Sequence, residues 1–164
     1  MKRLNTFILS LLTLFLLAGC STEDDVLEIF VGKTWKLTYI STENGHKQFD
    51  LWGSGDSSQS MEALGQANNF IVTFEGSEIN ATTGGTFNAR AITATVSGQW
   101  NANGSNREMT TSNVQVSYAE NDPLAIAFVR GLQNAVRYGG DSKNLYIYYK
   151  DNDNSIKRIN LIAK

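Results

Sequence analysis

Short stretches in which apolar and polar residues alternate constrain the fold of this chain more than any other feature. The clearest are residues 35–39, 70–74 and 92–100, in which every second residue is apolar or glycine. A period of two puts alternate side chains on opposite faces of a strand, so each stretch predicts a half-buried β-strand. Further strands are predicted at residues 109–118, 145–150 and 156–162, the last two as a closing hairpin.

Glycine pairs mark the expected breaks between strands. Gly76-Ser77 predicts a turn, and Gly84-Gly85 predicts a break between two short strands. Residues 41–60 are rich in Ser, Gly, Asn and Gln and predict a long loop, followed by a short helix that begins near Ser57. Loops of that length are typical of functional or mobile segments.

One segment predicts a longer helix. Asp122 can cap it, and Pro123 suits the first helical position, where no amide donor is needed. An apolar stripe with four-residue spacing follows, formed by Leu124, Phe128, Leu132 and Val136. Gly139-Gly140 would end the helix. The predicted fold class is therefore α+β: a mainly antiparallel β-sheet, curved or barrel-like, with the helix of residues 122–137 packed on it.

Residues 1–19 have the features of an export signal. Lys2 and Arg3 precede an apolar run, Phe7–Leu17, that is shorter than the roughly 20 residues of a transmembrane helix. The run ends in Leu17-Ala18-Gly19-Cys20, and a small pair directly before the only cysteine matches the bacterial lipoprotein pattern. An ordinary secretory signal is the alternative interpretation.

The likeness to lipoproteins implies that Cys20 becomes the first residue of the mature chain. It would carry diacylglycerol on its sulfur and a third acyl chain, such as palmitate, on its amine. Several chains anchor a protein stably, since each buried methylene contributes about 0.8 kcal/mol. A single cysteine also excludes an internal disulfide, and acylation would remove Cys20 as a nucleophile or metal ligand.

Three acids, Glu23, Asp24 and Asp25, follow the cysteine closely. They resemble the export signal of Bacteroidetes lipoproteins, which directs them to the outer leaflet of the outer membrane. We therefore predict a lipid-anchored outer-membrane protein at the cell surface, with residues 20–30 as its tether. The periplasmic face is the alternative location, and a solvated linker is the alternative role of the acids.

The rest of the chain, residues 31–164, is expected to form one domain and to act as a monomer. Without residues 1–19 the chain has 12 basic and 16 acidic residues, a formal charge of −4. A nucleic-acid surface needs clustered Lys and Arg to replace phosphate counterions, so this balance argues against a nucleic-acid partner.

No motif in the sequence points to catalysis, a cofactor or a metal. His46 is the only histidine and lies in a polar loop, which leaves too few ligands for zinc. Asp151–Asn154 lacks the Gly and Glu of a calcium loop and predicts a turn. A glycosidase needs two carboxylates in one cleft. The candidate acids are scattered along the chain, and the sequence does not place any two of them in one cleft: Glu62, Glu75, Glu78, Glu108 and Glu120.

Two aromatic residues, Phe49 and Trp52, lie in the polar loop of residues 41–60. We interpret them as candidate contacts to a ligand or partner, such as a sugar or a peptide. Packing against the end of the sheet is the alternative.

The order of elements over residues 31–163 resembles the META domain family, small lipoprotein or heat-shock-associated domains. It is also similar to uncharacterised Bacteroides lipoproteins known only as a domain of unknown function. The likeness rests on Gly32-x-x-Trp35-x-Leu37, Phe74, Met109, the helix Leu124–Val136 and the hairpin Leu145–Leu161. The Gly-x-x-Trp opening is similar to lipocalins as well. The META family's Cys-Asn pair is missing, and the resemblance supplies no catalytic residue.

These observations predict a non-enzymatic, lipid-anchored envelope protein with a binding or interaction role. A lipocalin-like carrier of a small apolar ligand is the first alternative, and it requires an internal apolar cavity. A carbohydrate-active enzyme is the second, and it requires two converging acids, one with a raised pKa. The third is an inhibitor of an envelope enzyme that acts through the loop of residues 41–60.

Overall fold

The computed structural model describes residues 24–79 and 82–164. Its eight-stranded antiparallel sheet has the order β5-β4-β3-β2-β1-β8-β7-β6. The strands are β1 (Thr34–Thr42), β2 (Ile71–Ile79), β3 (Thr82–Arg90), β4 (Thr95–Ala102), β5 (Met109–Val116), β6 (Ala135–Gly140), β7 (Asn144–Lys150) and β8 (Ile156–Ala163). The helices of this part are α2 (Val26–Phe30), α3 (Ser58–Gly65) and α4 (Pro123–Gln133). The predicted α+β class and the closing hairpin are confirmed.

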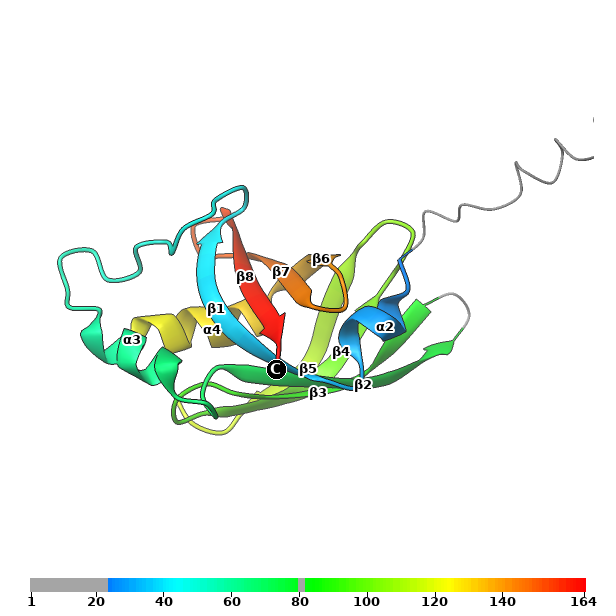
Figure 1. The fold of residues 1–164 in the computed structure, drawn as a ribbon, viewed down its shortest axis with the longest axis horizontal. Coiled ribbons are helices and arrows are strands. Elements are labelled where there is room, and N and C mark those ends of the chain that lie inside the picture. The colour runs from blue at the N-terminus through cyan, green and yellow to red at the C-terminus, as the bar shows by residue number, and fades with distance from the viewer. Residues whose placement is uncertain (1–23, 80–81) are drawn as a thin grey trace, which may run out of the picture.

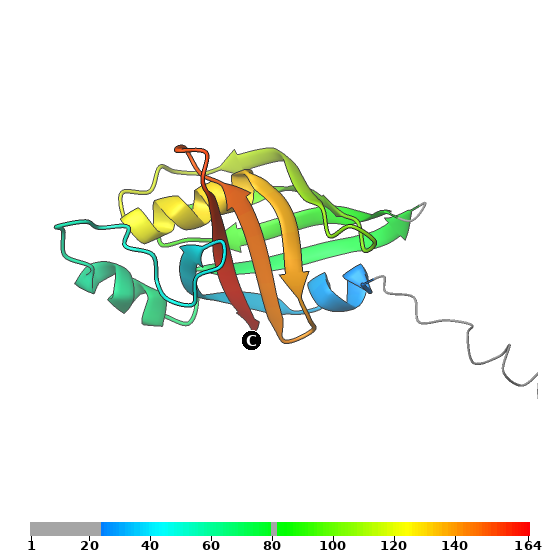
Figure 2. The ribbon, with the colours of Figure 1, turned by 90° about the horizontal axis from the view of Figure 1, so that it is seen from above.

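The sheet is strongly curved but not closed (Figure 1). The sheet bends at β1. Residues 34–36 of this strand pair with β2, whereas residues 35–42 pair with β8. The two edge strands, β5 and β6, are linked by α4. An isolated antiparallel bridge between Glu108 and Arg137 joins them, and there the Tyr138 amide donates to the Arg107 carbonyl at 3.0 Å. Figure 2 shows α4 lying alongside the half of the sheet that β8, β7 and β6 form.

Aromatic side chains fill the space enclosed by the curve. Phe30 of α2 stacks on Trp100 with ring centroids 4.7 Å apart, and it meets Phe74 and Tyr138 edge-on at 5.0 and 5.1 Å. All four side chains are buried. Such aromatic pairs contribute about 0.5–1.5 kcal/mol each beyond their buried area. The short helix α2 is therefore part of the core.

A bulge in β1 shifts the predicted alternation. The expected inward set was Trp35, Leu37 and Tyr39, but the pairing with β8 changes register between Leu37 and Tyr39. An extra residue in one strand turns the following side chains to the opposite face. Ile40 is consequently buried, and Tyr39 is only half-buried. The strand is confirmed, and the placement of Tyr39 was wrong.

The glycine pairs do not break the strands as predicted. Gly76 lies within β2 and pairs with Gly85 of β3, while Ser77 pairs with Gly84. A Cβ atom on Gly85 would lie 2.1 Å from the Glu75 carbonyl oxygen, so this close approach requires glycine. The glycines serve strand packing here, and the antiparallel pairing of β2 with β3 continues past them to Ile79 and Thr82.

The predicted helix of residues 122–137 ends earlier than expected. Its start is confirmed, since the Asp122 carboxylate accepts the Ala125 amide at 2.9 Å and Pro123 is the first helical residue. The helix ends at Gln133, and Ala135–Gly140 form β6. Val136 is exposed, whereas Tyr138 is buried against Phe30, so strand pairing with β7 outweighs the four-residue stripe at this point.

The predicted tether reaches into the folded part of the chain. Of residues 20–30, Val26, Ile29 and Phe30 are buried in α2. The predicted signal segment, Cys20 and Glu23 lie outside the described residues. Within the described residues, no helix has the length and apolar character needed to cross a membrane.

Candidate functional site

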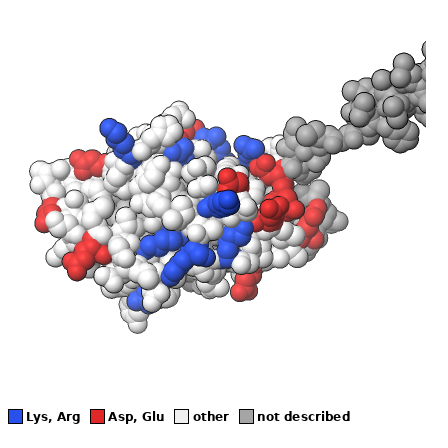
Figure 3. Space-filling model, in the orientation of Figure 1, with Lys and Arg blue, Asp and Glu red and all other residues white. Residues whose placement is uncertain are grey.

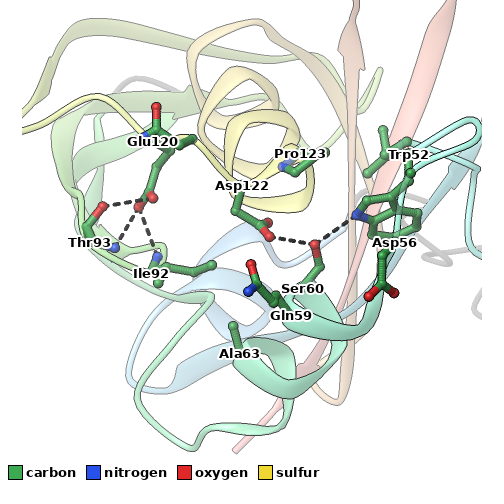
Figure 4. Close-up of a pocket in the computed structure, with 13 residues that line it drawn as sticks. Trp52, Asp56, Gln59, Ser60, Ala63, Ile92, Thr93, Glu120, Asp122 and Pro123 are labelled. Atoms are coloured by element: carbon green, nitrogen blue, oxygen red, sulfur yellow. Dashed lines mark hydrogen bonds between the residues drawn. The ribbon is translucent and has the colours of Figure 1, made fainter.

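An open cleft of about 520 Å³ lies at the α3 end of the molecule. Figure 4 shows its walls: Trp52 and Asp56 on one side, Thr93 and Glu120 on the other. The segments that form it are the loop before α3, the turn between β3 and β4, and the residues leading into α4. Segments far apart in the sequence thus meet in one concave surface.

A chain of hydrogen bonds fixes the Trp52 side of the cleft. The Trp52 indole donates to the Ser60 hydroxyl at 2.8 Å, and Ser60 donates to Oδ2 of Asp122 at 2.5 Å. Oδ1 of Asp122 accepts the Ala125 amide and caps α4. Ser60 is almost fully buried. The loop, α3 and α4 are therefore held together by side chains whose polar groups are satisfied.

Glu120 fixes the opposite side. One of its oxygens accepts the backbone amides of Ile92, Thr93 and Ala94 at 3.0, 2.8 and 2.7 Å, and the other accepts the Thr93 hydroxyl at 2.8 Å. Burial by itself raises the pKa of the Glu120 carboxyl, but these hydrogen bonds outweigh it and hold the pKa below its usual value. The carboxylate stays ionised and pins the turn between β3 and β4.

The structure separates the two aromatic residues singled out by sequence. Trp52 lines the cleft, and the Asp50 carboxylate orients it by accepting the Trp52 and Gly53 amides at 3.0 and 2.9 Å. Phe49 instead packs on the sheet: its amide donates to Ile40, and the Lys157 ammonium lies 4.1 Å from its ring centre. The ligand hypothesis therefore keeps Trp52, and packing accounts for Phe49.

The chain matches the family model described as Domain of unknown function (DUF4847) over residues 21–162. It belongs to the DUF4847 family. A crystal structure of a DUF4847 family protein from Bacteroides vulgatus ATCC 8482 is similar, with a TM-score of 0.54 and 21% identity over 84% of this chain and 96% of that chain. At that identity the likeness shows the fold alone. No curated protein matches.

The family supports the predicted likeness to a Bacteroides domain of unknown function. The finer resemblances to META domains and lipocalins are not shown by these comparisons. The DUF4847 fold is therefore established for this chain.

A second polar cluster of the DUF4847 domain was missed by sequence reasoning. Asp151 starts the predicted turn, which is confirmed by the 2.9 Å bond from its amide to the Ser155 carbonyl. Its buried carboxylate pairs with Arg130 of α4 at 2.8 Å and with Lys157 of β8. Burial by itself raises the pKa of Asp151. Hydrogen bonds from Lys157, the Asn152 amide and Arg130 lower this pKa by more, so the net shift is downward.

Of the remaining candidate residues, Asp24 and Asp25 bind other groups of the protein, and His46 does not line the cleft. Asp25 caps α2 by accepting the Glu28 amide at 2.9 Å, and Asp24 pairs with Arg107 at 2.9 Å. His46 is exposed, as expected. The described residues contain no group of three or more His, Cys, Asp or Glu side chains that could hold a metal ion.

Proposed function

We propose that this DUF4847 protein is a lipid-anchored cell-envelope protein that binds a ligand in the Trp52 cleft and catalyses no reaction. The observation that carries the proposal is the fixed geometry of the cleft. Both walls are held by hydrogen bonds within the protein, from Trp52 through Ser60 to Asp122 and from Glu120 to the facing turn. A site that is ordered before binding loses little entropy when a ligand arrives.

The position of the cleft suits a protein anchored through its N-terminus. The described chain begins beside α2 at one end of the molecule, and α3 with the cleft lies at the other end (Figures 1 and 2). Cys20 is four residues before Asp24. An acyl anchor at Cys20 would therefore hold the α2 end near the outer membrane and turn the cleft outward, in keeping with display at the cell surface.

The acids of the cleft suit binding better than catalysis. A glycosidase needs one carboxylic acid with a raised pKa. Glu120 has a lowered pKa, and Asp122 already accepts hydrogen bonds on both oxygens. The aromatic filling of the sheet interior likewise disfavours a carrier with an internal ligand.

The anchor is tested with the variant Cys20→Ala in the full chain. Acylation needs the Cys20 sulfur, so we expect this variant to leave the membrane fraction almost completely, whereas Ser21→Ala should remain there. Mass spectrometry of the mature wild-type N-terminus should show the acyl chains, and protease treatment of intact cells should degrade the wild-type domain. A wild-type protein without acyl chains, or a Cys20→Ala variant that stays in membranes, contradicts the anchor.

Binding in the cleft is tested by placing an environment-sensitive dye on the variant Ala63→Cys. Ala63 lines the cleft, while Glu62 is exposed on the same helix and lies outside it, so Glu62→Cys is the matched control. An extract of the native envelope should change the emission of the dye at position 63 by more than twofold over the change at position 62. Equal responses at the two positions contradict a ligand site at Trp52.

A further inference from the structure

The lining of the Trp52 cleft indicates a class of ligand. We propose that the cleft binds a neutral carbohydrate, an inference that rests on the proposed role of the cleft as a binding site. The volume of about 520 Å³ lies within the range of about 300–1,000 Å³ typical of small-ligand sites.

The charge of the cleft excludes an anionic ligand. The described residues that line it include Asp56, Glu120 and Asp122 but no Lys, Arg or His. In the view of Figure 3, acidic side chains lie at the α3 end and again at the opposite end, while most Lys and Arg lie over the middle of the molecule. A phosphate, sulfate or carboxylate group would meet like charges without a compensating cation.

The three carboxylates are also committed to the protein. Glu120 accepts four hydrogen bonds, and Asp122 accepts one on each oxygen. Asp56 accepts the amide and the hydroxyl of Ser58 at 2.9 and 2.7 Å. These donors occupy both oxygens of Glu120 and of Asp122, so an ammonium ion would compete with bonds that the protein already makes, which favours a neutral ligand.

Trp52 supplies the apolar surface that a sugar needs. Its ring is half-buried, and its indole N–H is already bonded to Ser60, so the ring is held in place and contributes area instead of a donor. The C–H faces of a pyranose pack on such a ring, while the hydroxyl groups at its rim still require polar partners.

Two amide side chains can serve the hydroxyl groups. Gln59 and Asn121 line the cleft and are exposed, and the described residues give neither side chain a hydrogen-bond partner. Each amide offers a donor and an acceptor, the combination that matches a hydroxyl, which is itself both. A fixed aromatic ring, free amides and the absence of cationic lining residues together fit a neutral sugar.

The test is calorimetric titration of the mature, detergent-solubilised protein with neutral oligosaccharides of hexoses and pentoses, with an acidic uronate oligosaccharide and with an alkylammonium salt. We expect neutral oligosaccharides to bind and the other two not to bind. Trp52→Ala should weaken binding at least tenfold. Because Trp52 also bonds Ser60, Gln59→Ala and Asn121→Ala provide further variants, each weakening binding several-fold with an unchanged melting temperature. Glu62→Gln is the neutral control.

The outcomes separate this inference from the proposed function. Preference for the uronate or the ammonium salt overturns the inference, as does neutral-sugar binding that survives all three cleft substitutions. Lack of binding to any neutral oligosaccharide, together with a dye response at position 63 to envelope extract, also overturns the inference but leaves the cleft as a binding site. Lack of both responses overturns the proposed function as well.

Discussion

Three glycines set how closely the strands approach beneath Trp100. Gly76 and Gly85 pair across β2 and β3, and the Trp100 indole donates to the neighbouring Glu75 carbonyl at 3.1 Å. A Cβ on Gly76 would lie 3.2 Å from the Trp100 ring and 2.5 Å from the Gly84 carbonyl oxygen. The missing side chains leave room for Trp100, and Phe30 then stacks on it. The residue that looks like a strand breaker in sequence is here a packing requirement.

The substitution Gly85→Ala tests this requirement. The added methyl would contact backbone atoms that cannot move independently, so we expect a loss of about 2 kcal/mol in the free energy of unfolding and a fall of roughly 5–8 °C in Tm. Gly65→Ala is the control, because nothing lies within 4 Å of its Cβ position in α3 and the change should be neutral or slightly stabilising. Equal melting curves for the two variants would refute the packing role.

At the scale of elements, local signals were sufficient where an element depends on its own residues. The hairpin of β7 and β8 and the start of α4 at Asp122 and Pro123 follow from alternation and capping alone. The end of α4 does not, because β6 pairs with β7 and buries Tyr138 against Phe30, in a helix more than 100 residues earlier in the chain. Sequence periodicity cannot report a contact of that kind.

The candidate site divides in the same way. An aromatic residue in a polar loop was the signal that selected Trp52, but it selected Phe49 equally, because the sequence does not show which of the two packs on the sheet. The partners of Trp52 could not be selected, because Ser60 and Asp122 are brought together from positions 62 residues apart. Glu120 was one of several scattered acids until the turn of residues 92–94 placed three amides against it. Tertiary structure, and no local pattern, makes this cleft.

At the scale of the whole molecule, two ion pairs of one buried carboxylate, Asp151, tie the last helix to the last hairpin. Arg130 comes from α4, Lys157 from β8, and Asp151 from the turn before β8. The Asp151 and Lys157 side chains are 7% and 8% exposed, so solvent screens their attraction little. The contact of α4 with the β7–β8 hairpin therefore depends on the charge of the Asp151 carboxylate, and we expect the stability of the protein to depend on pH.

The folded protein holds the pKa of Asp151 below the value of about 3.9 expected in the unfolded chain. The unfolded chain therefore takes up the proton first as pH falls, so the contribution of Asp151 is complete above about pH 4 and declines below it.

Asp151→Asn should lower the free energy of unfolding by about 3 kcal/mol at pH 7, because Lys157 loses its buried partner. Urea unfolding at pH 7, 5 and 3 should show this difference shrinking at the lowest pH, where the unfolded wild-type chain takes up a proton at Asp151 more readily than the folded protein does. Asp153→Asn, which changes an exposed acid in the same turn, should have little effect at pH 7. A wild-type advantage over Asp151→Asn that is as large at pH 3 as at pH 7 would show that shape, and not charge, gives Asp151 its role.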